Sequence, residues 1–145
     1  MTLLTVIGVS MGEKAFGAAA ANGEIWLTLR SEHDSDLMRL KQKVKNRAEE
    51  LSQQYGLGLD MWEQDVFPAT ENTPECAKKV IKRCGADILP TPMRWSEDFG
   101  HYLKVCSGAM IGMGAGVDCP GLHTESYEYP DALLPVSVQV FLSLI

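Results

Sequence analysis

The sequence predicts an α+β fold, and three observations support that prediction. Residues 2–9 are mostly apolar and β-branched, and residues 23–30 alternate apolar with polar side chains, as strands do. Residues 35–55 carry apolar side chains at three- and four-residue spacing, which is typical of an amphipathic helix. The chain has 145 residues, 46% of them hydrophobic, which excludes disorder over most of its length and suits one compact domain or two small ones.

The net charge, the lengths of the apolar runs and the cysteine spacing limit the classes of function that fit this sequence. Lys and Arg number 13 against 19 Asp and Glu, so the net charge is −6 and no electrostatic footprint for nucleic acid or anionic lipid exists. No apolar run approaches the ~20 residues that span a bilayer, and the first nine residues lack the features of a signal peptide. The four cysteines form no C-x-x-C pair. We therefore expect reduced thiols in a cytoplasmic protein that binds neither nucleic acid nor membrane.

The pattern of the first part of the chain predicts two strands, a helix and a third strand, in that order. Asp34 or Ser35 can cap the helix, and Gly56 suits the left-handed position after its last turn. Residues 57–67 alternate loosely, and we expect them to pair as a third strand. Such an arrangement would be half of a ferredoxin-like sandwich. The apolar stripe of the helix consists of Leu37, Leu40, Val44, Ala48, Leu51 and Tyr55.

A break in the pattern at residues 68–74 is the candidate linker between two parts, residues 1–68 and 69–145. After it, Thr73 and Pro74 predict the start of a helix that ends at Gly85.

Further elements are expected in the last third of the chain. Ser96 is expected to cap a second helix, with Glu97 and Asp98 in its first turn. Residues 108–114 read as a short buried strand. Residues 133–145 are apolar almost all round and predict a largely buried helix that begins near Pro135.

Reactive side chains gather near the chain breaks of the second part. Ser96, Glu97 and Asp98 place a hydroxyl and two carboxylates at a predicted helix N-terminus, either as a site or as a cap with acids that match the helix dipole. His123 lies in a loop after a glycine-rich run, either as a ligand or as a solvated side chain. Cys119 and His123 could donate two zinc ligands, but the sequence offers no second pair.

Four segments of the second part follow one another in a specific order. They are Met-Arg-Trp-Ser-Glu-Asp-Phe at 93–99, Gly-Ala-Met-Ile-Gly-Met-Gly-Ala-Gly at 108–116, Leu-His-Thr at 122–124 and Asp-Ala-Leu-Leu-Pro at 131–135. This order resembles the C-terminal end of the zinc-dependent peptidase and amidohydrolase superfamily, which includes carboxypeptidases, aminoacylases and succinyl-diaminopimelate desuccinylase. The upstream strand, long helix and strand resemble the second half of that superfamily's lid domain.

The resemblance implies a role for each part of the chain. Residues 1–68 would be a partial lid and dimerisation domain, and residues 69–145 the C-terminal part of an α/β catalytic domain. His123 matches the last of the residues that bind the metal ion. In the intact parent that ion is zinc or another divalent metal. Arg30 matches a lid arginine that faces the carboxylate of the substrate. The segment Ser96, Glu97 and Asp98 is expected on the substrate side of the site.

The remaining metal ligands and the general-base glutamate of the superfamily have no counterpart in this sequence. The resemblance therefore implies a fragment of an enzyme that cleaves an amide bond of an N-acyl amino acid or small peptide through metal-activated water. Alone, this chain is expected to be inactive, to bind no metal and to form a homo-oligomer. The alternative is a non-catalytic module for dimerisation or for binding a small metabolite.

Overall fold

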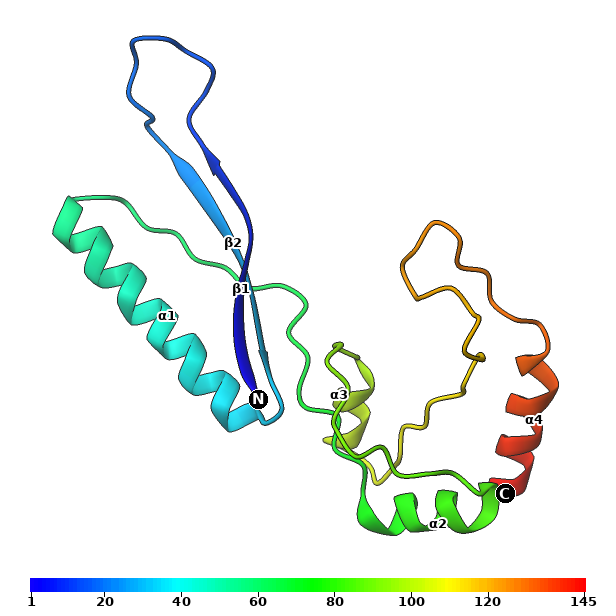
Figure 1. The fold of residues 1–145 in the computed structure, drawn as a ribbon. Helices are drawn as coiled ribbons and strands as arrows, with labels where there is room; N and C mark the ends of the chain where they lie inside the picture. Colours follow the sequence, from blue (N-terminus) through cyan, green and yellow to red (C-terminus); the bar gives the residue numbers. More distant parts are fainter. The chain divides into compact units, whose positions relative to one another are not determined.

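The computed structural model describes residues 1–145, which divide into two compact units. Met1–Ala69 and Pro92–Ser96 form the first unit, and Thr70–Thr91 and Glu97–Ile145 form the second. The chain contains two strands and four helices (Figure 1), so the predicted α+β fold is confirmed. The roles expected for the two parts, as a partial lid and part of a catalytic domain, stay predictions.

Strands β1 (Thr2–Met11) and β2 (Gly23–Ser31) form an antiparallel hairpin in the first unit. Both were predicted, and β1 extends two residues beyond its predicted end. A register irregularity between Val6 and Gly8 sets Gly8 opposite Trp26. A Cβ on Gly8 would lie 2.2 Å from Cε3 of the Trp26 ring, so the close approach of the ring depends on glycine. The sheet has these two strands only, and each leaves one edge open.

Helix α1 (Asp34–Tyr55) packs against the hairpin with the predicted apolar stripe. The stripe is half-buried from Leu37 to Leu51, whereas Tyr55 is exposed. Gly56 adopts the left-handed conformation expected of it, with φ 64°. The predicted caps are wrong, because His33 occupies the N-cap position. Asp34 is already helical, and its carboxylate accepts the backbone N–H of Ala69 at 2.6 Å.

Residues 57–67 form no strand, so this prediction is wrong and the expected half-sandwich lacks its third strand. The segment is instead held to α1 by a 2.9 Å ion pair between Lys41 and Glu63, and two residues beyond it Ala69 bonds to Asp34. Asp65 has φ 52°, which interrupts an extended backbone. Residues 57–67 pair with neither open edge of the hairpin, so β1 and β2 pair only with each other.

In the second unit, α2 (Pro74–Cys84) begins and ends where the sequence predicts. Thr73 is its N-cap residue, Pro74 stands in the first turn, and Gly85 follows in the left-handed conformation with φ 64°. Helix α2 packs against α4 (Leu133–Leu144). Val80 of α2, 7% exposed, is the one buried hydrophobic side chain of the chain.

Helix α4 is apolar, as predicted, but it is not buried. Phe141 is 66% exposed, and Leu134, Val136, Val138 and Leu142 are also exposed. Among the helices and strands, only α2 packs against α4, so the remaining apolar faces of α4 have no helix or strand to cover them. None of the four helices is both long and apolar enough to cross a membrane.

Helix α3 (Phe99–Leu103) begins three residues later than the cap predicted at Ser96. Asp98 is its N-cap residue, and its φ and ψ of −75° and −13° are already helical. Ser96 and Glu97 therefore precede the helix, and the expected first turn with two acids does not form. The hydroxyl of Ser96 has another partner, the side chain of Arg30.

The strand predicted at residues 108–114 is also absent. Its backbone groups bond to two residues that precede α2. Thr73 donates its N–H to the Gly108 carbonyl at 2.9 Å, and its hydroxyl accepts the Gly108 N–H at 3.1 Å. The Asn72 amide accepts the Met110 N–H at 2.8 Å and donates to the Met110 carbonyl at 3.0 Å. These contacts replace part of a neighbouring strand.

Candidate functional site

A hydrogen-bonded pair, Arg30 and Ser96, joins two residues that the sequence assigns to substrate binding. Arg30 lies near the end of β2 and is half-buried. Its Nη1 donates to the hydroxyl of Ser96 at 3.1 Å and to the main-chain carbonyl of Arg94 at 2.9 Å. The two side chains are 66 positions apart in the sequence, and both belong to the first unit.

Glu97 and Asp98, the other two residues of the predicted segment, lie in the second unit. Glu97 is half-buried and Asp98 is exposed. Neither forms a hydrogen bond or an ion pair with His123, so no contact links them to the expected ligand. Their assignment to a substrate site stays a prediction.

His123 is exposed and lies in a tight turn. The turn is closed by Thr124, whose N–H and hydroxyl donate to the carbonyl of Gly121 at 3.3 Å and 2.7 Å. The backbone of His123 is left-handed, with φ 66°, a conformation that non-glycine residues adopt infrequently. The turn therefore presents the imidazole of His123 to solvent from a strained backbone.

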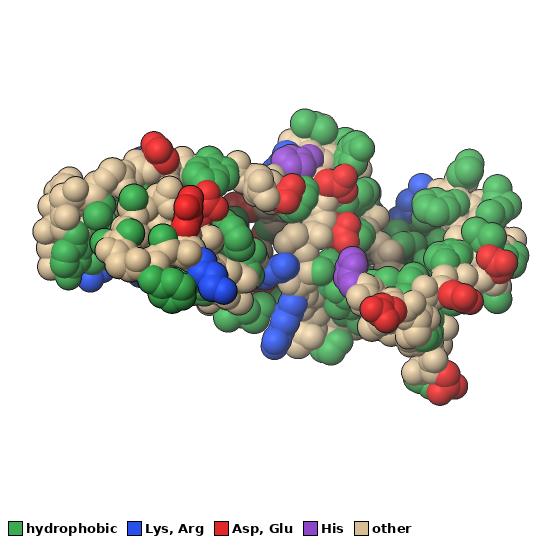
Figure 2. Space-filling view, turned by 90° about the horizontal axis from the view of Figure 1, so that it is seen from above, with side chains coloured by type: hydrophobic (Ala, Val, Ile, Leu, Met, Phe, Trp, Pro, Cys, Tyr) green, Lys and Arg blue, Asp and Glu red, His purple; other side chains and the backbone are tan.

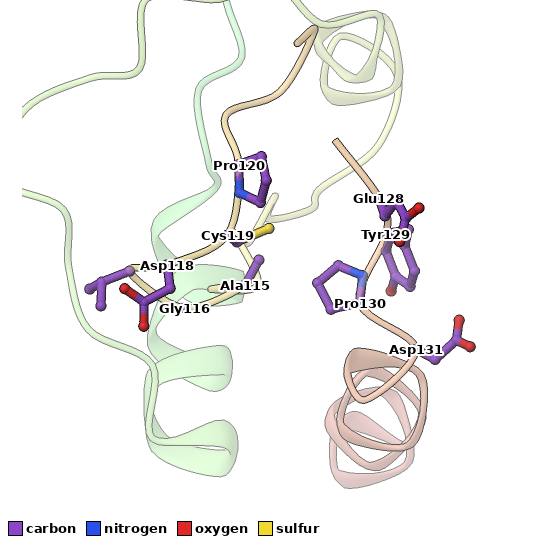
Figure 3. A pocket seen from close by; sticks show the side chains of 10 residues that line it. Ala115, Gly116, Asp118, Cys119, Pro120, Glu128, Tyr129, Pro130 and Asp131 are labelled. Carbon is purple, nitrogen blue, oxygen red and sulfur yellow. The ribbon is translucent and has the colours of Figure 1, made fainter. Parts of the chain in front are cut away.

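An open hollow of about 560 Å³ lies in the second unit, between residues 115–120 and 128–131 (Figure 3). It contains the Cys119 thiol and three carboxylates, but the carboxylates of Glu128 and Asp131 point away from Asp118 (Figure 3). His123 does not line this hollow. The hollow therefore contains acidic residues that do not converge on a common point.

The donor set for a metal ion is incomplete within this chain. No three His, Cys, Asp or Glu side chains lie close enough together to hold an ion. A catalytic zinc site needs about three protein ligands and a water molecule. The residues present do not fit such a site, and the Cys119–His123 pair gains no third ligand.

The sequence could not reveal one of the two groups that accept a hydrogen bond from Arg30. The carbonyl of Arg94 is a main-chain group, and every residue carries one, so its role leaves no mark in the residue types. The only available signal was its position two residues before Ser96, at the start of the predicted segment.

Comparison with known proteins gives one distant relationship. The chain is 22% identical over 130 residues to a protein of Staphylococcus saprophyticus described as an uncharacterized hydrolase. The match covers 83% of this chain and 34% of that protein, so the chain spans about a third of the length of this curated relative. No family model and no solved structure matches the chain. The chain is thus distantly similar to a hydrolase, within an α+β fold.

Proposed function

We propose that this chain is the C-terminal part of a metal-dependent amidohydrolase or peptidase, which cleaves an amide bond of an N-acyl amino acid or small peptide. The observation that carries the proposal is the Arg30–Ser96 hydrogen bond, because the resemblance assigns these two residues to the substrate through separate segments, Arg30 in the lid and Ser96 in the ordered motifs. The similarity to a longer protein that is described as a hydrolase, of which the match covers 34%, supports the same proposal.

In this proposal Arg30 binds the carboxylate of the substrate. A guanidinium presents planar, paired N–H donors that match the two oxygens of a carboxylate. Arg30 forms no ion pair within the chain, whereas Lys45 and Arg47 of α1 each have an acidic partner. A half-buried cation without a carboxylate partner is suited to bind one from solution.

His123 is the proposed last metal ligand, and the other ligands and the general base would lie outside this chain. Metal-activated water is the chemistry that the bound ion would supply. No group of three His, Cys, Asp or Glu side chains lies around His123, so in this proposal the hydrolytic step depends on residues outside this chain. Its own contribution is to hold the substrate and to offer one ligand.

Zinc analysis and an amidase assay test this proposal. The purified chain with added zinc should show no turnover of N-acetyl amino acids or dipeptides, and far less than one zinc per chain. The DNA upstream of Met1 should continue the reading frame and encode a His-x-Asp or Cys-x-His segment and paired glutamates. Turnover by the chain alone, or an upstream frame without these ligands, would refute the proposal.

A non-catalytic association module is the second candidate, and the exposed surface favours it. Apolar side chains are exposed in each unit, for example Val9 of β1 in the first and Phe141 of α4 in the second. Hydrophobic side chains lie exposed at many places on the face shown in Figure 2. On the hairpin they include Val6, Ile7, Val9 and Ile25, beside two open sheet edges. Such surfaces favour association with another polypeptide.

A further inference from the structure

The guanidinium of Arg30 has more donors than its partners within the chain use. Its Nη1 carries two N–H groups, and two acceptors lie within hydrogen-bond distance of this nitrogen, the Arg94 carbonyl and the Ser96 hydroxyl. Nη2 and Nε form no hydrogen bond within the chain. These two nitrogens share one edge of the planar group, and their parallel N–H bonds can bind both oxygens of a carboxylate.

We infer that Ser96 is a positioning residue for Arg30. Two acceptors on one nitrogen fix the direction of both of its N–H bonds, and therefore the plane of the whole guanidinium. The Arg94 carbonyl alone would leave that plane free to tilt about a single hydrogen bond. With Ser96 in place, the Nε–Nη2 edge is the one presented to the carboxylate of a substrate.

The Ser96 hydroxyl also retains a function of its own. Its oxygen accepts from Arg30, and its hydrogen has no acceptor within the chain. A hydroxyl can accept and donate at the same time, so this hydrogen is available to a bound carboxylate. Ser96 is exposed, which leaves room for such a ligand. This inference rests on the proposed function, which assigns Arg30 to the substrate carboxylate.

The test is a titration of the chain with N-acetylglycine, in which the NMR signal of the Arg30 Nε–H reports binding. Arg30→Lys identifies the signal by its loss. N-acetylglycinamide, which lacks the carboxylate, is the control ligand. Ser107→Ala is the control variant, because Ser107 is also exposed and forms no hydrogen bond. Ser96→Thr keeps the hydroxyl, so it tests whether a hydroxyl at this position restores the binding of N-acetylglycine.

N-acetylglycine should shift the Arg30 signal in a saturable way, and the amide should not. Ser96→Ala should weaken this binding about tenfold, the value of one hydrogen bond of ordinary net strength. Ser96→Thr should restore much of the affinity, and Ser107→Ala should leave it unchanged.

Two other outcomes distinguish a failure of the inference about Ser96 from a failure of the proposed function. Equal affinity in Ser96→Ala and the unaltered chain overturns the role of Ser96 and leaves Arg30 as the carboxylate ligand. No response of the unaltered chain to N-acetylglycine overturns the carboxylate role of Arg30, and the inference with it.

Discussion

Asn72 and Thr73 satisfy the backbone of a segment that has no strand beside it. Between them they form four hydrogen bonds to Gly108 and Met110, two of which use the Asn72 amide. In the first unit, the side chain of Arg30 likewise forms a hydrogen bond to a main-chain group, the Arg94 carbonyl. At the scale of the residue, single polar side chains therefore hold segments that lack regular secondary structure.

Asn72→Ala should release the backbone of Met110. Both hydrogen bonds to Met110 are lost, so amide exchange at its N–H should rise about fivefold, as expected for about 1 kcal/mol. Asn72→Asp is the matched variant, since a carboxylate still accepts from the N–H but cannot donate to the carbonyl. Hydrogen exchange followed by NMR measures both. Equal protection of Met110 in Asn72→Ala and the unaltered chain would contradict this assignment.

His123 adopts a backbone conformation that glycine would adopt at lower cost. His123→Gly should therefore leave the free energy of unfolding unchanged or raise it by about 1 kcal/mol, despite the greater freedom of glycine in the unfolded chain. His123→Ala keeps the Cβ and should not show this gain. Chemical denaturation measures both variants. A marked loss of stability in His123→Gly would show that the imidazole itself makes a stabilising contact.

At the scale of the element, the hairpin and α1 form where local pattern and packing agree. The stripe of α1 meets the sheet, and the irregularity at Gly8 lets the Trp26 ring lie across β1. Segments 57–67 and 108–114 have a strand-like pattern but pair with no strand. A strand-like pattern is therefore not sufficient for a strand to form in this chain.

Gly8→Ala should destabilise the hairpin by about 1–3 kcal/mol, because the new Cβ would overlap the Trp26 ring. Thermal unfolding followed by Trp fluorescence and circular dichroism measures the effect. In a Trp26→Ala background the same substitution should cost much less, since the overlapping atoms are gone. An equal cost in both backgrounds would place the cause in the backbone of the bulge.

At the scale of the whole molecule, apolar surface remains exposed in both units. Val9 on β1 and Phe141 on α4 are 63% and 66% exposed. Exposed apolar strands with open edges and an apolar helix with uncovered faces favour association.

Sedimentation should therefore find a dimer or larger species, or poor solubility. Val9→Lys places a charge on the exposed hairpin and should shift the distribution toward monomer. Lys14→Arg in the loop after β1 keeps both charge and exposure and should have no effect. A monodisperse monomer with a cooperative thermal transition would contradict this expectation and favour an independent binding module.

Local signals along the chain were enough to predict several helices and strands. Both strands of the hairpin, helices α1 and α2, and the left-handed glycines at 56 and 85 all follow from periodicity and end signals within a few residues. The family resemblance also singled out Ser96, through the motif order, and Arg30, through the lid segment. Such features depend on neighbours along the chain, so residue types alone reveal them.

Which strand-like segments pair and which side chains meet depends on the tertiary fold. Residues 57–67 and 108–114 pair with no strand, and the alternation within a segment does not specify which other segments folding brings beside it. The exposure of α4 likewise depends on what packs around it. The Arg30–Ser96 contact spans 66 positions, and a hydrogen bond over that separation forms only because folding brings the hairpin and residues 92–96 into one unit.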